Sequence, residues 1–261
     1  MNKTIMTIEE LKKQIVDVAK LMYKNGYIAA NDGNVSVLLD DGTIVTTPSG
    51  VSKGMLTPEA LVIINKNGEK ISGGTSLNSK PSSEIKMHLK VYELRSDIKA
   101  VVHAHPPITT AFSVANIRLS DCILPETIFT LGNIKITEYA TPTTEAVPKS
   151  IEKSIIDNDV IILTRHGSLT VGDSLMDAYL KLESLEHTAK IISESMKLSL
   201  ASSSVTPLPP QEIERLKGIR NALLESKQRK KSSANELNDS TELTEEMVNQ
   251  LVYEVLKRLE N

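Results

Sequence analysis

The chain has 261 residues, of which 40% are hydrophobic, so it is long enough to bury one large core. Its formal net charge is −3 and only 3% of its residues are aromatic, so neither a basic surface nor stacking rings indicate a nucleic-acid partner. A single cysteine, Cys122, excludes an internal disulfide, and the sequence contains no signal-like segment and no apolar run of membrane-spanning length. A cytoplasmic protein is expected.

The first part of the chain is predicted to form one helix and two hairpins. A capping box at Thr7 to Glu10 starts a run of apolar residues at helical spacing, which is expected to end at Gly26. Asp-Gly and Asn-Gly turns then interrupt short β-rich segments, which predicts hairpins at 35–46 and 62–71.

The second part of the chain is predicted to alternate helices with short strands. A helix is expected to begin at Pro81, because Pro, Ser and an acid occupy its first turn. The other expected elements are strands at 98–102, 134–139 and 160–163 and helices at 145–156, 173–200 and 211–226. This pattern predicts an α/β fold with a mixed, largely antiparallel sheet.

Three histidines lie at predicted strand ends. Residues two apart on a strand share a face, so His103 and His105 point the same way before Pro106 and Pro107 stop the strand. His166 follows the buried strand at 160–163. Together the three imidazoles suit a zinc site that keeps one open position, and the alternative is core or solvated histidines.

A second group of motifs is typical of segments that bind an anion. Glu84 follows Ser82 and Ser83 at a helix start, where free N–H groups and hydroxyls favour a phosphate. The turns at Gly33-Asn34 and at 47–50 offer further backbone and hydroxyl donors. Taken one at a time, such segments are usually ordinary turns.

In this order, the motifs resemble those of the class II aldolase/adducin family, and within it the fuculose-1-phosphate aldolase group. The resemblance covers roughly residues 8–200. It rests on Gly33-Asn34-Val35-Ser36, Thr47-Pro48-Ser49-Gly50, Pro81-Ser82-Ser83-Glu84, His103-Ala104-His105 and His166-Gly167. It implies a three-layer α/β/α sandwich that forms a homotetramer with active sites between subunits.

The resemblance also implies roles for individual residues. Zn²⁺ would be bound by His103, His105 and His166, and by Glu84 when no substrate is present. Glu84 would also be the catalytic acid/base. The substrate phosphate would be bound by the matching positions, which are Gly33, Asn34, Thr47, Ser49, Gly50, Ser82 and Ser83.

The implied reaction is cleavage of a 6-deoxyketose 1-phosphate, L-fuculose or L-rhamnulose 1-phosphate, to dihydroxyacetone phosphate and lactaldehyde. The fuculose aldolases use a tyrosine from a neighbouring subunit near position 124–126. Here Glu126 stands there, and it is the candidate second acid/base. Other members of the family keep alternatives open: pentulose-phosphate 4-epimerases, which carry Asp in place of Glu84, methylthioribulose-phosphate dehydratases, and adducin-like binding modules.

Two further histidines have simpler interpretations. His88 lies four residues after Glu84 on one helix face, so an extra ligand is conceivable, but a packed helix histidine is the favoured interpretation. His187, inside the long helix predicted at 173–200, is interpreted as structural.

The chain changes character after residue 200. Residues 1–226 are assigned to the catalytic domain, the polar residues 227–241 to a flexible linker, and residues 242–261 to an amphipathic helix. This last segment resembles the C-terminal encapsulation peptides of bacterial microcompartments, which implies a shell protein as its partner and a location inside a compartment. The alternatives are packing on the enzyme's own tetramer and binding to a membrane surface, which the weakly basic polar face disfavours.

Overall fold

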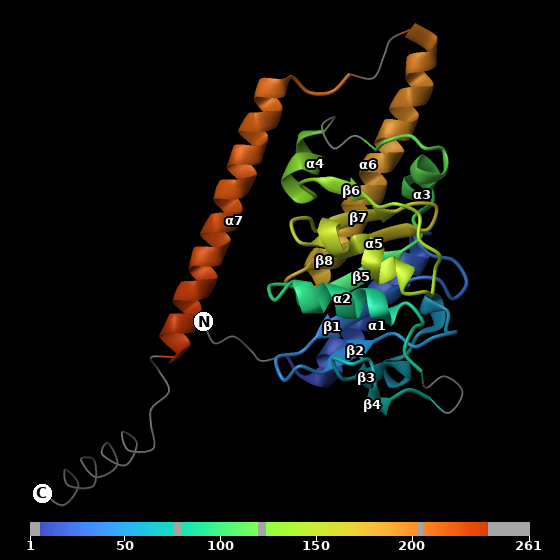
Figure 1. The fold of residues 1–261 in the computed structure, drawn as a ribbon, viewed down its shortest axis with the longest axis vertical. Helices are drawn as coiled ribbons and strands as arrows, with labels where there is room; N and C mark the ends of the chain where they lie inside the picture. The colour runs from blue at the N-terminus through green and yellow to red at the C-terminus, as the bar shows by residue number, and fades with distance from the viewer. Residues whose placement is uncertain (1–5, 76–79, 120–123, 203–205, 240–261) are drawn as a thin grey trace, which may run out of the picture. The chain divides into compact units, whose positions relative to one another are not determined.

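A mixed β-sheet forms the centre of the first unit of the chain (Figure 1). The computed structural model describes residues 6–75, 80–119, 124–202 and 206–239 and divides the chain into units 1–214 and 215–261. Within the described residues the sheet has eight strands. They are β1 (Asn34–Leu38), β2 (Ile44–Thr46), β3 (Val62–Ile64), β4 (Lys70–Gly73), β5 (Ala100–Ala104), β6 (Ile134–Ile136), β7 (Val160–Leu163) and β8 (Gly167–Gly172).

The strand order is β4-β3-β2-β1-β5-β8-β7-β6, and every neighbouring pair is antiparallel except β6 with β7. The two predicted hairpins are confirmed as β1–β2 and β3–β4. In the pair of β1 with β5, Asn34 lies opposite His103. Because opposed residues project to the same face, the sheet register brings a predicted phosphate position beside a predicted metal ligand.

Helices cover both faces of the sheet. On one face, Met87 of α2 and Ile151 of α5 pack against Val101 of β5. On the other face, α1 and α6 pack against the sheet around Val102. The helices are α1 (Ile8–Lys24), α2 (Ile85–Leu94), α3 (Pro107–Val114), α4 (Pro125–Thr130), α5 (Ala146–Ile155) and α6 (Leu175–Ser202), with short 3₁₀ turns η1 (Lys53–Met55) and η2 (Pro58–Ala60). The predicted three-layer α/β/α sandwich is therefore confirmed.

The capping box at the start of α1 is also confirmed. The Thr7 hydroxyl accepts a hydrogen bond from the backbone N–H of Glu10, whose side chain accepts one from the backbone N–H of Thr7. After α1 ends, Gly26 adopts a φ of 72°, a conformation that favours glycine.

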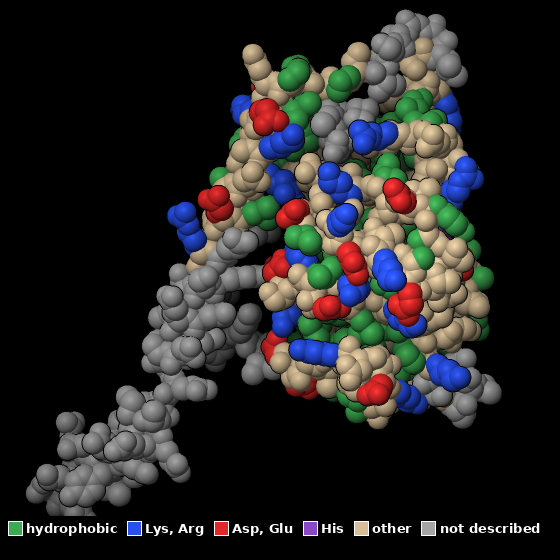
Figure 2. Space-filling view, viewed as in Figure 1, with side chains coloured by type: hydrophobic (Ala, Val, Ile, Leu, Met, Phe, Trp, Pro, Cys, Tyr) green, Lys and Arg blue, Asp and Glu red, His purple; other side chains and the backbone are tan. Residues whose placement is uncertain are grey.

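The face that carries α2 and α5 is charged but mixed in sign. Figure 2 shows acidic and basic side chains interspersed over it rather than gathered by sign. Lys86 and Lys90 of α2 pair with Glu145 and Glu152, at the start of α5 and within it. A face of this composition is typical of a solvated helix layer.

Three helices or strands of the first unit, β8, α3 and α4, were not predicted from the sequence. Strand β8 was not predicted, because its segment begins and ends with glycine. Helix α3 was not predicted either, because Pro106 and Pro107 were interpreted as a stop, whereas Pro107 opens the helix. The carboxylate of Glu186 on α6 accepts hydrogen bonds from the backbone N–H groups of Ile108 and Thr109, at 2.8 and 2.9 Å, and so caps α3.

Helix α7 (Pro210–Asp239) leads into the second unit. Residues 227–239 are therefore helical, in contrast to the linker predicted there. The physical reason is that this stretch contains no Gly or Pro and several residues of high helix propensity. The predicted tail helix at 242–261 lies outside the described residues. No helix in the described part of the chain is both long and apolar enough to cross a membrane.

Candidate metal centre

Four side chains converge at the end of β5. Glu84 is the N-cap of α2, His103 lies in β5, His105 follows that strand, and His166 lies in the turn between β7 and β8. One ligand atom from each of the four lies within 4.8 Å of all the others. His103 is fully buried, and the other three are partly buried. The structure thus brings together all four residues that the resemblance assigns to the metal.

The separations between these atoms fit a single cation. Nε2 of His103 lies 2.8 Å from Oε2 of Glu84 and 3.1 Å from Nε2 of His105. Nε2 of His166 lies 3.3 Å from Oε1 of Glu84. A tetrahedral cation with bonds of about 2.0–2.2 Å holds its ligands roughly 3.3–3.6 Å apart, so the pairs that involve His103 would move apart slightly around an ion. Three imidazole nitrogens and one carboxylate oxygen therefore form a donor set that suits a divalent first-row metal.

The outer nitrogens of two of these imidazoles have partners that orient the rings. Nδ1 of His103 donates a hydrogen bond to the carbonyl oxygen of Ser168 at 2.8 Å. Nδ1 of His105 lies 3.3 Å from the carboxylate of Asp32. Such partners leave Nε2 free for a metal and hold the ring in place. Sequence reasoning missed Asp32, since it lies in a turn and no spacing links it to His105.

The electrostatics of the cluster favour the forms that can bind a cation. Burial acts to raise the pKa of the Glu84 carboxyl, but hydrogen bonds from His103 and His166 outweigh it and hold the pKa well below its usual range. Burial, reinforced by His103 and His166, lowers the pKa of His105 to about 4. At neutral pH Glu84 is ionised and His105 is neutral, and these are the states in which each is a ligand.

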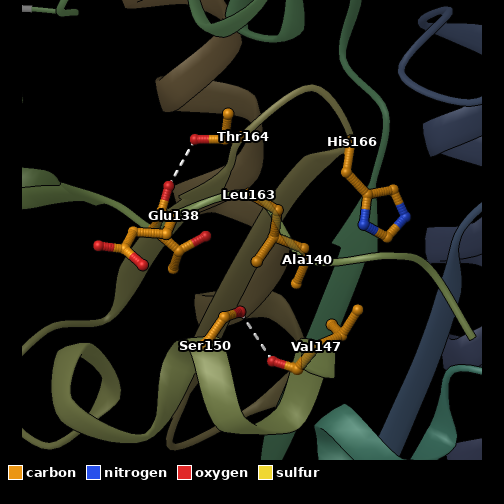
Figure 3. A pocket seen from close by; sticks show the side chains of 8 residues that line it. Glu138, Ala140, Val147, Ser150, Leu163, Thr164 and His166 are labelled. Atoms are coloured by element: carbon orange, nitrogen blue, oxygen red, sulfur yellow. Dashed lines mark hydrogen bonds between the residues drawn. The ribbon is translucent and has the colours of Figure 1, made fainter. Parts of the chain in front are cut away.

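The turn that carries His166 depends on an unusual backbone conformation at Arg165 and on a close packing contact at Gly167. Arg165 adopts a φ of 57°, and the N–H of His166 donates to the carbonyl oxygen of Leu163 at 3.0 Å. A Cβ atom on Gly167 would lie 2.2 Å from the carbonyl oxygen of Ala104 and 2.8 Å from Cδ2 of His105, so only glycine fits there. Figure 3 shows the imidazole of His166 lining a small pocket, on the opposite side from Glu138.

The segments predicted to bind phosphate lie next to the N-terminus of α2. Pro48 forms a bridge with Pro81, and the N–H of Ser49 donates to the carbonyl oxygen of Lys80 at 3.0 Å. The turn at 47–50 is therefore joined to the segment that carries Ser82 and Ser83. The hydroxyl of Ser82 accepts a hydrogen bond from the N–H of Glu84 at 3.3 Å.

The remaining predicted phosphate positions lie on and before β1. Gly33 has a φ of 70°, and a Cβ there would lie 2.8 Å from the carbonyl oxygen of His103. The side chain of Asn34 is buried, and neither of its amide atoms has a hydrogen-bond partner among the residues that the structure describes. The hydroxyl oxygen of Thr47 accepts a hydrogen bond from the N–H of Val35 at 3.2 Å.

Glu126, the predicted second acid/base, is not part of this cluster. It is exposed in the first turn of α4. A contact of Glu126 with the substrate would therefore require a different site or a neighbouring subunit.

The two other histidines lie apart from the cluster. His88 is fully buried on α2, and its Nδ1 lies 2.7 Å from the hydroxyl of Ser36, which also contacts the hydroxyl of Tyr92 at 2.7 Å. This is the packed helix histidine expected from the sequence. His187 is exposed on α6, so the interpretation of this residue as structural is not supported by burial.

Comparison with known proteins places this geometry in a family. The family model described as "Class II Aldolase and Adducin N-terminal domain" matches residues 13–193. A 3-oxo-tetronate 4-phosphate decarboxylase of Escherichia coli K12 is 33% identical over 188 residues, which are 70% of this chain and 86% of that protein. An L-fuculose phosphate aldolase of Methanococcus maripaludis is 35% identical over 178 residues, which are 68% of this chain and 93% of that protein.

The fold comparison agrees. The crystal structure of YgbL from Escherichia coli has a TM-score of 0.72 at 30% sequence identity and covers 80% of this chain and 99% of its own. The α/β/α sandwich, which this chain shares with class II aldolases of known structure, and the cluster of Glu84 with three histidines that could hold a metal ion define the class of protein. The chain belongs to the class II aldolase and adducin family.

Proposed function

We propose that the protein is a zinc-dependent aldolase that cleaves L-fuculose 1-phosphate, or L-rhamnulose 1-phosphate, to dihydroxyacetone phosphate and lactaldehyde. The observation that supports this proposal is an ionised carboxylate, Glu84, within 3.3 Å of two histidines of the three-histidine cluster. The segments suited to a phosphate begin immediately before that carboxylate. The arrangement can therefore hold a phosphorylated ketose beside a carboxylate that can accept and return a proton.

In this reaction the bond between C3 and C4 of the ketose breaks. The hydroxyl on C4 gives its proton to the second acid/base, for which Glu126 is proposed, and becomes the aldehyde. The electron pair of the broken bond passes to an enediolate across C2 and C3. A divalent cation held by the cluster would supply Lewis-acid stabilisation for that charge. Ionised Glu84 takes up a proton from solvent and delivers it to C3, and in the condensation direction the ionised carboxylate removes it again. The serines at the start of α2 bind the phosphate and orient the chain of carbons.

A second candidate function is decarboxylation of 3-oxo-tetronate 4-phosphate, which a curated relative is named for. This substrate is a 3-oxo acid, so loss of CO₂ from C1 leaves the same enediolate, which Glu84 would protonate to dihydroxyacetone phosphate. This route requires no acid/base at an aldehyde oxygen. It is favoured by one observation, that Glu126 is exposed on α4 and outside the cluster of its own chain.

Product analysis by mass spectrometry distinguishes these reactions. The zinc-supplied protein is incubated with each of the three phosphorylated compounds. Dihydroxyacetone phosphate with lactaldehyde supports the aldolase, and dihydroxyacetone phosphate with CO₂ supports the decarboxylase. Methylthioribulose 1-phosphate and a pentulose phosphate are supplied in parallel. Loss of water without fragmentation would indicate a dehydratase, and an isomer of unchanged mass, separated by chromatography, would indicate an epimerase. No reaction in protein with bound metal would support a binding module.

The proposal extends to assembly. A homotetramer would place Glu126 of one subunit near the cluster of the next, where it acts as the second acid/base of the aldolase. Light scattering tests the assembly, and mixing subunits that carry Glu126→Gln with subunits that carry Glu84→Gln tests the sharing. Mixed tetramers should regain part of the activity, because some sites then combine both intact residues.

The proposal for the tail rests on the sequence pattern alone. Residues 242–261 carry the apolar stripe of a docking helix and are proposed to bind a microcompartment shell protein. A fluorescent protein fused to residues 241–261 should form puncta in cells that assemble shells and remain diffuse in cells that do not. Diffuse fluorescence in both would reject the encapsulation role.

A further inference from the structure

Lys53 is a buried lysine between two of the segments predicted to bind phosphate. It opens η1, and only 1% of its surface is exposed. Its Nζ donates hydrogen bonds to the carbonyl oxygens of Asn31, at 2.6 Å, and Val51, at 3.2 Å. Asn31 precedes the Gly33 turn, and Val51 follows Gly50. One ammonium group thus joins the two loops.

The positive charge of Lys53 has no carboxylate bonded to it among the described residues. The negative charge of Asp32 attracts the ammonium group from a distance. The Asp32 carboxylate itself is half-exposed and lies against Nδ1 of His105. A buried charge is costly unless an opposite charge compensates it. Burial accordingly lowers the pKa of Lys53 to about 8, although Asp32 acts in the opposite direction.

The predicted phosphate positions lack the complementary charge. Every one of them is a glycine, a serine, a threonine or an asparagine, so they offer only neutral donors to a group that carries close to two negative charges. Lysine is a common partner of phosphate because its ammonium is a compact charge. The ammonium group of Lys53 bonds to backbone carbonyl oxygens of the two loops that contain the neutral donors at Gly33 and Gly50, so a buried positive charge adjoins the segments predicted to hold the anion.

We propose that Lys53 supplies the positive charge that binds the phosphate of the substrate, from beneath the loops that contain Gly33 and Gly50. This inference rests on the proposed function, because it takes the bound anion to be a phosphate. Lys53 is a binding residue in this account and takes no part in bond breaking. Its two hydrogen bonds also fix the distance between the loops, so the charge and the neutral donors are positioned together.

The first test compares variants for binding of inorganic phosphate by isothermal titration at pH 7, with the full chain supplied with zinc. Lys53→Met keeps the length of the side chain and removes the charge. We expect phosphate affinity to fall about tenfold or more, because a hydrogen bond or ion pair to a charged group is lost. Lys66→Met removes an exposed lysine from the β3–β4 turn and should leave the affinity within about twofold.

The second test needs no variant and decides the matter if Lys53→Met does not fold. Sulfate stays a dianion near pH 8, where a lysine of pKa about 8 is about half protonated. Sulfate bound next to Lys53 should raise the pKa of this lysine, so that Lys53 takes up as much as about half a proton per sulfate bound. Calorimetric titrations in buffers of different ionisation enthalpy measure this number of protons. His105 stays neutral at this pH, since its pKa is about 4.

Proton uptake together with weaker phosphate binding in Lys53→Met would support the proposal. Sulfate binding without proton uptake, or equal phosphate affinity in Lys53→Met and the unaltered protein, would overturn it. Neither measurement depends on turnover. Phosphate binding that requires Lys53 in a protein that cleaves no substrate would reject the proposed function alone. If the protein cleaves a substrate but Lys53→Met binds phosphate as tightly as the unaltered protein does, this inference alone would be rejected.

Discussion

The carboxylate of Asp32 lies 3.3 Å from Nδ1 of His105, on the opposite side of the ring from the Nε2 atom that faces His103. Asp32 belongs to the loop before β1, whereas His105 directly follows β5. The contact therefore couples the loop that precedes Gly33 and Asn34 to the metal cluster. A carboxylate in this position keeps the proton on Nδ1 and increases the basicity of Nε2.

Replacement of Asp32 should weaken metal binding without unfolding the protein. We expect Asp32→Asn to lower zinc affinity by about tenfold or more, because the ring of His105 loses its charged partner. Competition with a chromophoric chelator measures the affinity. Asp17→Asn, an exposed change on α1, is the matched control and should leave zinc affinity unaltered. Equal affinity in Asp32→Asn and this control would show that the contact does not support the site.

Replacement of Glu84 should mainly reduce turnover, whereas replacement of His103 should mainly reduce metal binding. Glu84→Gln keeps the shape of the side chain but cannot carry a proton, so turnover should fall about 100-fold or more while much of the metal remains bound. His103→Ala removes a buried ligand and should empty the site. Metal content by atomic emission and rates of product release measure the two effects. Unchanged turnover in Glu84→Gln would contradict the acid/base role.

Gly167 should tolerate no side chain. In Gly167→Ala the new methyl group would meet the carbonyl oxygen of Ala104 at 2.2 Å and Cδ2 of His105 at 2.8 Å. Unfolding free energy should fall by about 1–3 kcal/mol, and metal affinity should fall with it because His105 is displaced. Gly218→Ala on α7, where a Cβ meets nothing within 4 Å, should be neutral or stabilising. Denaturant titration compares the two variants.

His88 should make the metal-free protein less stable in acid. Burial lowers the pKa of His88 to about 3 from an ordinary value of 6.5, so the unfolded chain binds a proton that the folded chain excludes. The stability contribution is complete above pH 6.5 and is lost as the pH falls from 6.5 toward 3. Between pH 7.5 and pH 5 this residue should account for about 2 kcal/mol.

Urea titration at both pH values, in excess chelator, measures this effect. His88→Gln keeps a polar group at the site and removes the titration, so its stability should fall less between pH 7.5 and pH 5. An equal fall in His88→Gln and the unaltered protein would assign the acid sensitivity to other groups.

Local patterns were sufficient to predict the parts of the fold and site that depend on near neighbours. The His103 and His105 spacing on a strand predicts two imidazoles on one face, and both enter the cluster. Asp-Gly and Asn-Gly turns identified both hairpins. These features follow from backbone periodicity and turn chemistry, which act over a few residues.

Features that depend on distant partners were not predictable in this way. The burial of Lys53 depends on the loops that contain Asn31 and Val51, which fold around its side chain. The contact of Asp32 with His105 depends on the pairing of β1 with β5, which brings together residues far apart in the sequence. The helical stretch at 227–239 was missed for another reason. Its polar composition is equally typical of a linker and of a helix without an apolar face.

The most direct test of the central claim is release of dihydroxyacetone phosphate under control of the metal. The full chain is assayed with L-fuculose 1-phosphate, L-rhamnulose 1-phosphate and 3-oxo-tetronate 4-phosphate, first as prepared, then after treatment with chelator, and finally after zinc is restored. We predict that at least one substrate yields dihydroxyacetone phosphate, that chelator abolishes the release, and that zinc restores it. Absence of dihydroxyacetone phosphate from all three substrates in protein with bound zinc would contradict the account.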